Sequence, residues 1–267
     1  MSGAGSGDVV TLTAKDLDDL RHARTLLEHP SLAARMTGLL GTPIEKGLDL
    51  LPANWSGALT TATRAAITRA LDVAVATMGD RGPGPAANRL HKLTLAATGA
   101  LGGALGLSAL AIELPVSAMV MLRSIADVGR SEGEQIRSIE SRLACIEVFA
   151  LGGRLPSDDA GDLGYFAIRT ALARAMAEAA QFIAERGVAR EGAPVLVKLV
   201  AQIAARFEVV VSEKAAAQAL PLIGAAGGAI VNLLFIDHFQ DMARGHFIVR
   251  RLERTWGTEA VRERYES

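Results

Sequence analysis

The chain has 267 residues, 50% of them hydrophobic and 21% charged, and its 28 Lys and Arg against 29 Asp and Glu leave a net charge of -1. This composition excludes a disordered chain, and the near-zero net charge argues against nucleic acid as a partner. The single cysteine excludes an internal disulfide framework and a cysteine-built zinc site, and is typical of a reducing compartment such as the cytoplasm.

The kind of hydrophobic residue predicts the fold class. Aromatic residues make up only 4% of the chain, so its hydrophobicity comes mainly from Ala, Leu, Val and Ile. Ala and Leu favour helices, whereas a large sheet needs more β-branched and aromatic residues. No sustained alternation of apolar and polar residues between hairpin turns predicts a strand. We therefore expect an all-α protein, a multi-helix bundle of about eight to ten helices.

Residues 13–79 have the pattern of an N-terminal helical region. Before them, residues 1–12 are rich in Gly and Ser, which predicts a flexible N-terminus without the basic and apolar regions of a secretory signal. Thr13 and Asp16 have the spacing of a capping box, which predicts a helix that ends before Pro30. Apolar residues at helical spacing predict further helices over 32–40 and 56–78.

A break separates this region from the main helical body. Residues 80–85, DRGPGP, cannot continue a helix because they hold two Pro and two Gly. We expect residues 86–257 to form the main body, in one compact domain with 13–79, and residues 258–267 to form a C-terminal tail. Cys145 lies on an apolar helix face and is expected to be a buried structural thiol. Periodicity and breaker residues predict helices over 134–151, 157–186, 193–219 and 221–256.

Two uncharged, glycine-rich segments stand out in the main body, residues 93–112 and 215–236. Their length is that of a transmembrane helix, but their Gly, Thr, Pro and amide residues make both marginal for insertion. Three interpretations stay open: packed core helices, a monotopic or re-entrant membrane contact, and full spanning. Glycines spaced by four let helices approach closely in water and in lipid alike. The glycines expected at such contacts are Gly99, Gly102, Gly103, Gly106, Gly224 and Gly228.

The second half of the last predicted helix carries a cluster of ionisable residues. Asp237, Asp241 and Arg244 fall at i, i+4 and i+7 and share one helix face. His238 and Asp241 have a spacing that could ligate one metal ion, with His246 two turns further on, although this is not the HExxH spacing. The cluster is interpreted as an ion-paired structural face, a lipid head-group or ligand contact, or a catalytic or metal site. We assign no catalytic residue, no metal and no cofactor.

A second cluster follows the first uncharged segment. Glu113 precedes Leu-Pro at the end of an apolar run, so its carboxylate is expected to be partly desolvated. Arg123 and Asp127, at i and i+4, can pair along one helix. Two interpretations stay open: a buried structural network that reaches the Asp237 to Arg244 region, and the polar floor of an apolar pocket.

An ordered set of segments resembles the bacterial EcsC family of proteins. The resemblance covers about residues 30–257, and no single short motif carries it. What it implies is modest: a helical protein, membrane-associated in many members, from a family that lacks an established activity and offers no catalytic residues to transfer. The segments that carry it are ELPVSAMVMLRSIADVGR at 113–130, CIEVFALGG at 145–153, PLIGAAGG at 221–228 and FIDHFQDMARGHF at 235–247.

The uncharged segments and the resemblance together predict a non-enzymatic, membrane-associated protein that binds lipid or a membrane partner through its glycine-rich apolar helices. We expect it in the cytoplasm, peripheral on the inner face of the membrane, with no nucleic acid partner. One alternative is a hydrolase of an apolar substrate that uses Asp237, His238 and Asp241, and another is a soluble adaptor or homo-oligomer. The basic residues expected to face anionic head groups are Arg244, Arg250, Arg251 and Arg254.

Overall fold

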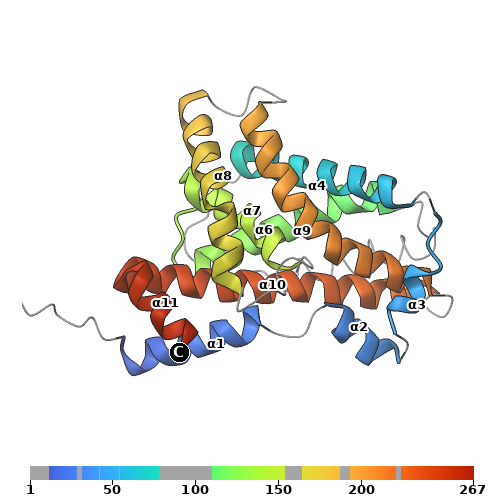
Figure 1. Cartoon of the computed structure of the whole chain (residues 1–267), viewed down its shortest axis with the longest axis horizontal. Helices are drawn as coiled ribbons and strands as arrows, with labels where there is room; N and C mark the ends of the chain where they lie inside the picture. Colours follow the sequence, from blue (N-terminus) through green and yellow to red (C-terminus); the bar gives the residue numbers. More distant parts are fainter. Residues whose placement is uncertain are drawn as a thin grey trace, which may run out of the picture.

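The computed structural model describes residues 12–28, 32–41, 43–53, 55–77, 110–153, 164–186, 193–220 and 224–267. These residues form ten helices and no strand, so the predicted all-α class is confirmed for the described part of the chain (Figure 1). The helices are α1 (Ala14–Leu27), α2 (Leu32–Leu40), α3 (Glu45–Leu48), α4 (Trp55–Thr77), α6 (Leu110–Ser131), α7 (Ile139–Leu151), α8 (Tyr165–Arg186), α9 (Pro194–Ala219), α10 (Gly224–Trp256) and α11 (Thr258–Glu266).

Local sequence signals set several helix ends as predicted. Thr13 caps α1, accepting a hydrogen bond from the backbone N–H of Asp16 while the Asp16 side chain accepts from the Thr13 backbone, which completes the capping box. Pro194 occupies the first turn of α9, where its missing N–H costs nothing. Helix α7 starts later than the predicted residue 134, because Ser138 caps it at Ile139. The predicted break at 80–85 lies outside the described residues.

The C-terminal end differs from the expected tail at 258–267. Gly257, with φ of 86°, ends α10 and turns the chain into a further helix, α11. Val261 and Tyr265, four residues apart, are buried on the inner face of α11. Tyr265 packs edge-on against Phe166 of α8. The segment is polar overall, so only these two positions reveal that it packs.

Helix α10 is the axis of the molecule. It packs along α1, α6, α7 and α9 and also contacts α2 and α11 (Figure 1). At its crossing with α1 the helices lie so close that a Cβ on Gly245 would come within 2.6 Å of Leu27 Cγ and 3.0 Å of the Ala23 carbonyl oxygen. Only glycine allows this approach.

The hydrophobic core lies where α7, α9 and α10 meet. Phe149, Phe207 and Phe239 pack against one another with ring centroids 5.1–5.5 Å apart, and Phe235 extends the cluster along α10. Cys145 is buried as expected, and burial raises the pKa of its thiol to about 12, so it stays an unreactive thiol. Four phenylalanines therefore form the aromatic centre of this core.

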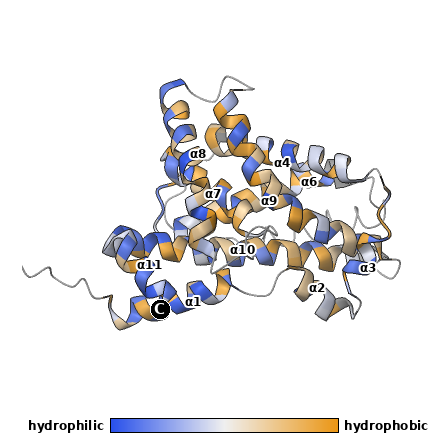
Figure 2. Ribbon diagram, in the orientation of Figure 1, coloured by the Kyte–Doolittle hydropathy of each residue, from blue (hydrophilic) through white to orange (hydrophobic). Residues whose placement is uncertain are grey.

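Hydropathy is distributed unevenly along the molecule. Figure 2 shows α1 and α11 largely hydrophilic at one end, while the end of α9 and the beginning of α10 are largely hydrophobic at the other. Among the described helices, none combines the length and the apolar character needed to cross a bilayer.

Candidate functional site

The predicted Glu113 lies in a buried polar cluster near the beginnings of α6 and α10. Its Oε1 accepts hydrogen bonds from Lys214 Nζ of α9 at 2.8 Å and from Asn232 Nδ2 of α10 at 2.9 Å. Lys214 is 0% exposed, and its ammonium lies 4.9 Å from the centre of the Phe235 ring. Burial lowers the pKa of Lys214, and the Glu113 carboxylate opposes that shift. This cluster connects three helices as a buried ion pair.

Arg123 and Asp127 do not form the pair that we expected. Asp127 forms its ion pair with Arg130, one turn later, and Arg123 is exposed at the surface. The expected connection between α6 and α10 exists, but through Ser124, whose hydroxyl accepts a hydrogen bond of 2.8 Å from Gln240.

The Asp237, His238 and Asp241 cluster is divided among separate contacts. His238 is buried, and its Nε2 lies 2.9 Å from the Gly152 carbonyl oxygen, so the ring donates a hydrogen bond to the end of α7. Burial lowers the pKa of His238 and favours its neutral form. Asp241 pairs with Arg35 of α2 at 3.1 Å. Among the described residues, no group of three His, Cys, Asp or Glu side chains is placed to hold a metal ion.

Three of the four basic residues expected at lipid head groups are held by ion pairs inside the fold. Arg250 and Arg254 both pair with Glu134, a buried residue in the turn before α7. Arg251 pairs with Asp19 at 2.9 Å and with Glu132 at 3.0 Å. Only Arg244 is exposed without an ion pair to a described residue. The cluster therefore connects α10 to its neighbours instead of forming a free basic surface.

The described surface has an apolar end. Six large hydrophobic side chains are exposed in the described part of the chain, and five of them lie on α2, on α3 and the turn that follows it, and on the first turns of α6 and α10. These segments lie toward the same end of the molecule (Figure 1). The five residues, 39–58% exposed, are Leu39, Leu48, Leu50, Val116 and Ile230, and we call them the apolar end.

The glycines predicted at close helix contacts are only partly within reach of the structure. Gly99, Gly102, Gly103 and Gly106 lie outside the described residues. Gly224 begins α10, but its contacts lie outside the described part of the structure. Gly228 is buried in the first turns of α10. The structure describes a close approach at another glycine, in α3: a Cβ on Gly47 would lie 2.0 Å from the Ala216 carbonyl oxygen of α9.

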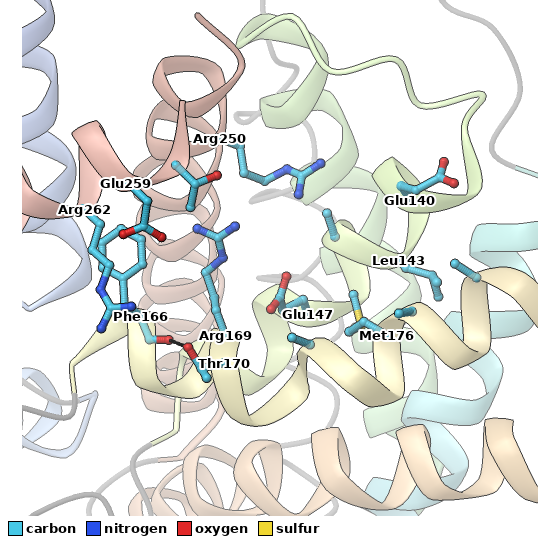
Figure 3. Close-up of a pocket in the computed structure, with 15 residues that line it drawn as sticks. Glu140, Leu143, Glu147, Phe166, Arg169, Thr170, Met176, Arg250, Glu259 and Arg262 are labelled. Carbon is cyan, nitrogen blue, oxygen red and sulfur yellow. Dashed lines mark hydrogen bonds between the residues drawn. The ribbon is translucent and has the colours of Figure 1, made fainter. Parts of the chain in front are cut away.

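A cavity of about 410 Å³ lies between α7, α8, α10 and α11, at the hydrophilic end of the molecule. Figure 3 shows Arg169, Arg250, Arg262 and Glu259 on one side of it and Leu143 and Met176 on the other. Glu147 of α7 lies between the two sides, with its carboxyl group directed into the space. The cavity therefore has a charged side and a mainly apolar side, with Glu140 near Leu143 at the edge of the apolar side.

Glu147 is backed by two buried residues, His246 and Tyr165. Tyr165 Oη lies 2.9 Å from His246 Nδ1, and burial raises the pKa of the phenol, so the neutral tyrosine shares a hydrogen bond with the imidazole. Burial holds the pKa of His246 well below its ordinary value, which favours the neutral ring, and its Nε2 lies 3.7 Å from Glu147 Oε2. That distance is too long for a hydrogen bond.

Sequence reasoning identified Glu113 and His246 but missed Lys214, Glu147, Arg169 and Tyr165. Lys214 and Glu147 had a usable signal: each is a charged residue within a predominantly apolar stretch of a predicted helix. Arg169 and Tyr165 had none, because their partners lie more than 80 positions away in sequence, at Glu253 and His246.

Comparison with known proteins gives one match. The model of the EcsC protein family matches residues 85–252, which include most of α6 to α10, Glu113, Glu147 and Lys214. No curated protein and no solved structure matches the chain.

Proposed function

Since the chain belongs to the EcsC protein family, whose description names no activity, we propose from its own surface that it is a non-enzymatic, peripheral membrane protein that contacts lipid through its apolar end. The membrane in this proposal is the cytoplasmic membrane, approached from its inner face. The observation that carries the proposal is the concentration of exposed Leu39, Leu48, Leu50, Val116 and Ile230 at one end of the molecule.

Two features favour a lipid surface as the occupant of the apolar end. Contiguous exposed apolar side chains on a soluble surface mark a contact with protein or membrane. The uncharged sequence 93–112 leads directly into α6, which begins at this end, and the uncharged sequence 215–236 includes the end of α9 and the beginning of α10. The beginnings of α6 and α10, which belong to these stretches, therefore lie toward the same end of the molecule as the five exposed side chains.

The size of the apolar end sets the strength of the contact. Five half-exposed aliphatic side chains contribute on the order of 5 kcal/mol when they leave water, comparable to a single acyl anchor. Around them, Glu45, Lys46 and Asp49 carry no excess of positive charge. Binding is therefore reversible and hydrophobic, with little contribution from anionic lipid.

Flotation with vesicles of phosphatidylcholine, which carry no net charge, tests the proposal. The double variant Leu48→Ser, Leu50→Ser removes two exposed side chains from the apolar end. We expect it to lower the vesicle-binding constant about thirtyfold, because each substitution removes about 1 kcal/mol of transfer free energy. Val197→Ser is the matched control, since Val197 is equally exposed (54%) but lies on the first turn of α9, away from the apolar end.

Two results would contradict the proposal. One is vesicle binding by the double variant that equals that of Val197→Ser. The other is a wild-type protein that stays unbound and forms a concentration-dependent dimer that the double variant abolishes, which would make a second copy the occupant. Circular dichroism of both variants verifies that each keeps its helical fold.

A further inference from the structure

The cavity between α7, α8, α10 and α11 has the features of a small-molecule site and is independent of the membrane proposal. Its volume of about 410 Å³ lies within the range of ligand pockets. It lies at the α11 end of the molecule, whereas the apolar end lies at α3 (Figure 1). What it binds can therefore be tested without any lipid surface.

Glu147 is the side chain best placed to bind a ligand in the cavity. It is 6% exposed, its carboxyl group faces the cavity, and it forms no hydrogen bond with any described residue. A carboxyl group that faces the cavity without a protein partner can exchange its hydrogen bonds to water for hydrogen bonds to a ligand. Burial raises the pKa of Glu147, and a protonated carboxyl can both donate and accept a hydrogen bond.

The arginines around Glu147 set the charge that the ligand can carry. Arg169 forms a bidentate pair with Glu253 at 2.7 and 3.0 Å, and Arg250 pairs with Glu134 at 2.8 Å. Arg250 shares Glu134 with Arg254. Across the whole lining, three acidic side chains balance three basic ones, so neither an anion nor a cation meets a surplus of opposite charge; the six are Glu140, Glu147, Glu259, Arg169, Arg250 and Arg262. An uncharged polar group fits best.

The opposite side of the cavity is shaped for a hydrocarbon. Leu143 and Ala144 of α7 face Ala173, Met176, Ala177 and Ala180 of α8, which line it with small and flexible side chains. Alanines on one helix face leave a shallow groove, and methionine adapts to the shape of what lies in it.

We propose that this cavity binds a small uncharged amphipathic molecule, with a hydroxyl or amide group hydrogen-bonded to Glu147 and a short aliphatic chain packed on the alanine face of α8. Arg169 and Arg250 keep N–H groups that face the cavity for a second polar atom of the same head group. His246, which shares a hydrogen bond with Tyr165, lies behind Glu147 at the base of the site.

Three probes with the same hydrocarbon chain and different head groups test the proposal: 1-hexanoylglycerol, hexanoate and hexylamine. The readout is the ¹³C-methyl NMR signal of Met176, identified by its loss in Met176→Leu. We expect 1-hexanoylglycerol to shift this signal and to bind more tightly than either charged probe. Tighter binding of hexanoate or hexylamine would overturn the uncharged class, and no shift at any soluble concentration of the three would overturn the site.

Variants of Glu147 separate its hydrogen bonds from its bulk. Glu147→Gln keeps a donor and an acceptor and is expected to bind 1-hexanoylglycerol within about threefold of the wild type, whereas Glu147→Leu is expected to lose about tenfold. Glu178→Gln, on the exposed face of α8 outside the cavity, is the control. Ala177→Trp fills the apolar side and should abolish binding, with Glu147 and the Met176 signal intact. Unchanged binding in both Glu147→Leu and Ala177→Trp would place the ligand elsewhere.

Discussion

Ionisable side chains in the interior of this protein are held by partners on distant helices. Lys214 and Glu113 are separated by 101 positions in sequence, and Arg250 and Glu134 by 116. Each such pair is costly to bury and much more costly to break on one side, because the remaining charge has neither water nor a partner. The described interior therefore depends on matched pairs.

Lys214 should show this dependence directly. Lys214→Met leaves the Glu113 carboxylate buried, with Asn232 as its remaining donor among the described residues, and we expect it to lower the free energy of unfolding by about 3–5 kcal/mol. Adding Glu113→Gln removes the stranded charge and should recover part of that loss. Urea unfolding of both single variants and the double variant measures the coupling, and additive losses would show that the two side chains do not interact.

Glu213 predicts a pH dependence of stability. Burial raises its pKa from 4.5 to about 7, opposed by a hydrogen bond from the Ala33 backbone N–H at the beginning of α2. The folded protein holds this proton more tightly than the unfolded chain, so Glu213 lowers stability as pH rises from about 4.5 to 7 and adds no further change above that. Its full effect is on the order of 3 kcal/mol.

Glu213→Gln isolates this contribution from those of other titrating groups. The amide oxygen can still accept from Ala33 but cannot ionise, so the variant should gain stability over the wild type at pH 8 and differ little at pH 4. Chemical denaturation at the two pH values measures the difference. A stability difference that stays the same at both pH values would contradict the raised pKa.

At the scale of helices, much of the architecture could be predicted from the sequence. The capping box at Thr13 and the apolar periodicity of 56–78 fixed α1 and α4 to within a residue or two. Helix α11 was missed because only Val261 and Tyr265 bury their side chains in an otherwise polar segment. The site residues were predicted less accurately than the helices. The contacts of Glu147, Arg169 and Lys214 depend on how helices distant in sequence pack, and the local spacing of residues does not encode this packing.

The crossing of α1 and α10 gives a prediction at this scale. Gly245→Ala places a methyl group against Leu27 and the Ala23 backbone, and we expect it to lower the free energy of unfolding by about 1–3 kcal/mol although alanine favours helices. Gly38→Ala makes the same change within α2, where a Cβ meets nothing within 4 Å, and should raise stability by up to about 1 kcal/mol. Thermal unfolding of the two variants should therefore shift in opposite directions.

At the scale of the whole molecule, charge and hydropathy are separated along α10. The apolar end lies where α10 begins, and the ion-paired arginines Arg250, Arg251 and Arg254 lie where it ends (Figure 2). Because these arginines are already neutralised within the fold and lie away from the apolar end, they have no part in the lipid contact that we propose.

Salt should therefore have little effect on that contact. Raising NaCl from about 0.05 to 0.5 M shortens the Debye length severalfold and weakens electrostatic adsorption strongly. We expect the bound fraction on phosphatidylcholine vesicles to stay within about twofold over this range, and added phosphatidylglycerol to change it little. Release of the protein by high salt would assign the contact to basic residues such as Arg244 instead.

The length of α10 has a consequence for where each end of the protein works. Ile230 at the apolar end and Arg250 at the cavity are 20 residues apart on this one helix, which is about 30 Å of rigid rod. A molecule standing on its apolar end would hold the cavity well above the lipid head groups, opening to the aqueous side. A ligand would then reach the cavity by diffusion through water. The bilayer would hold the protein at the membrane surface but would not supply its ligand.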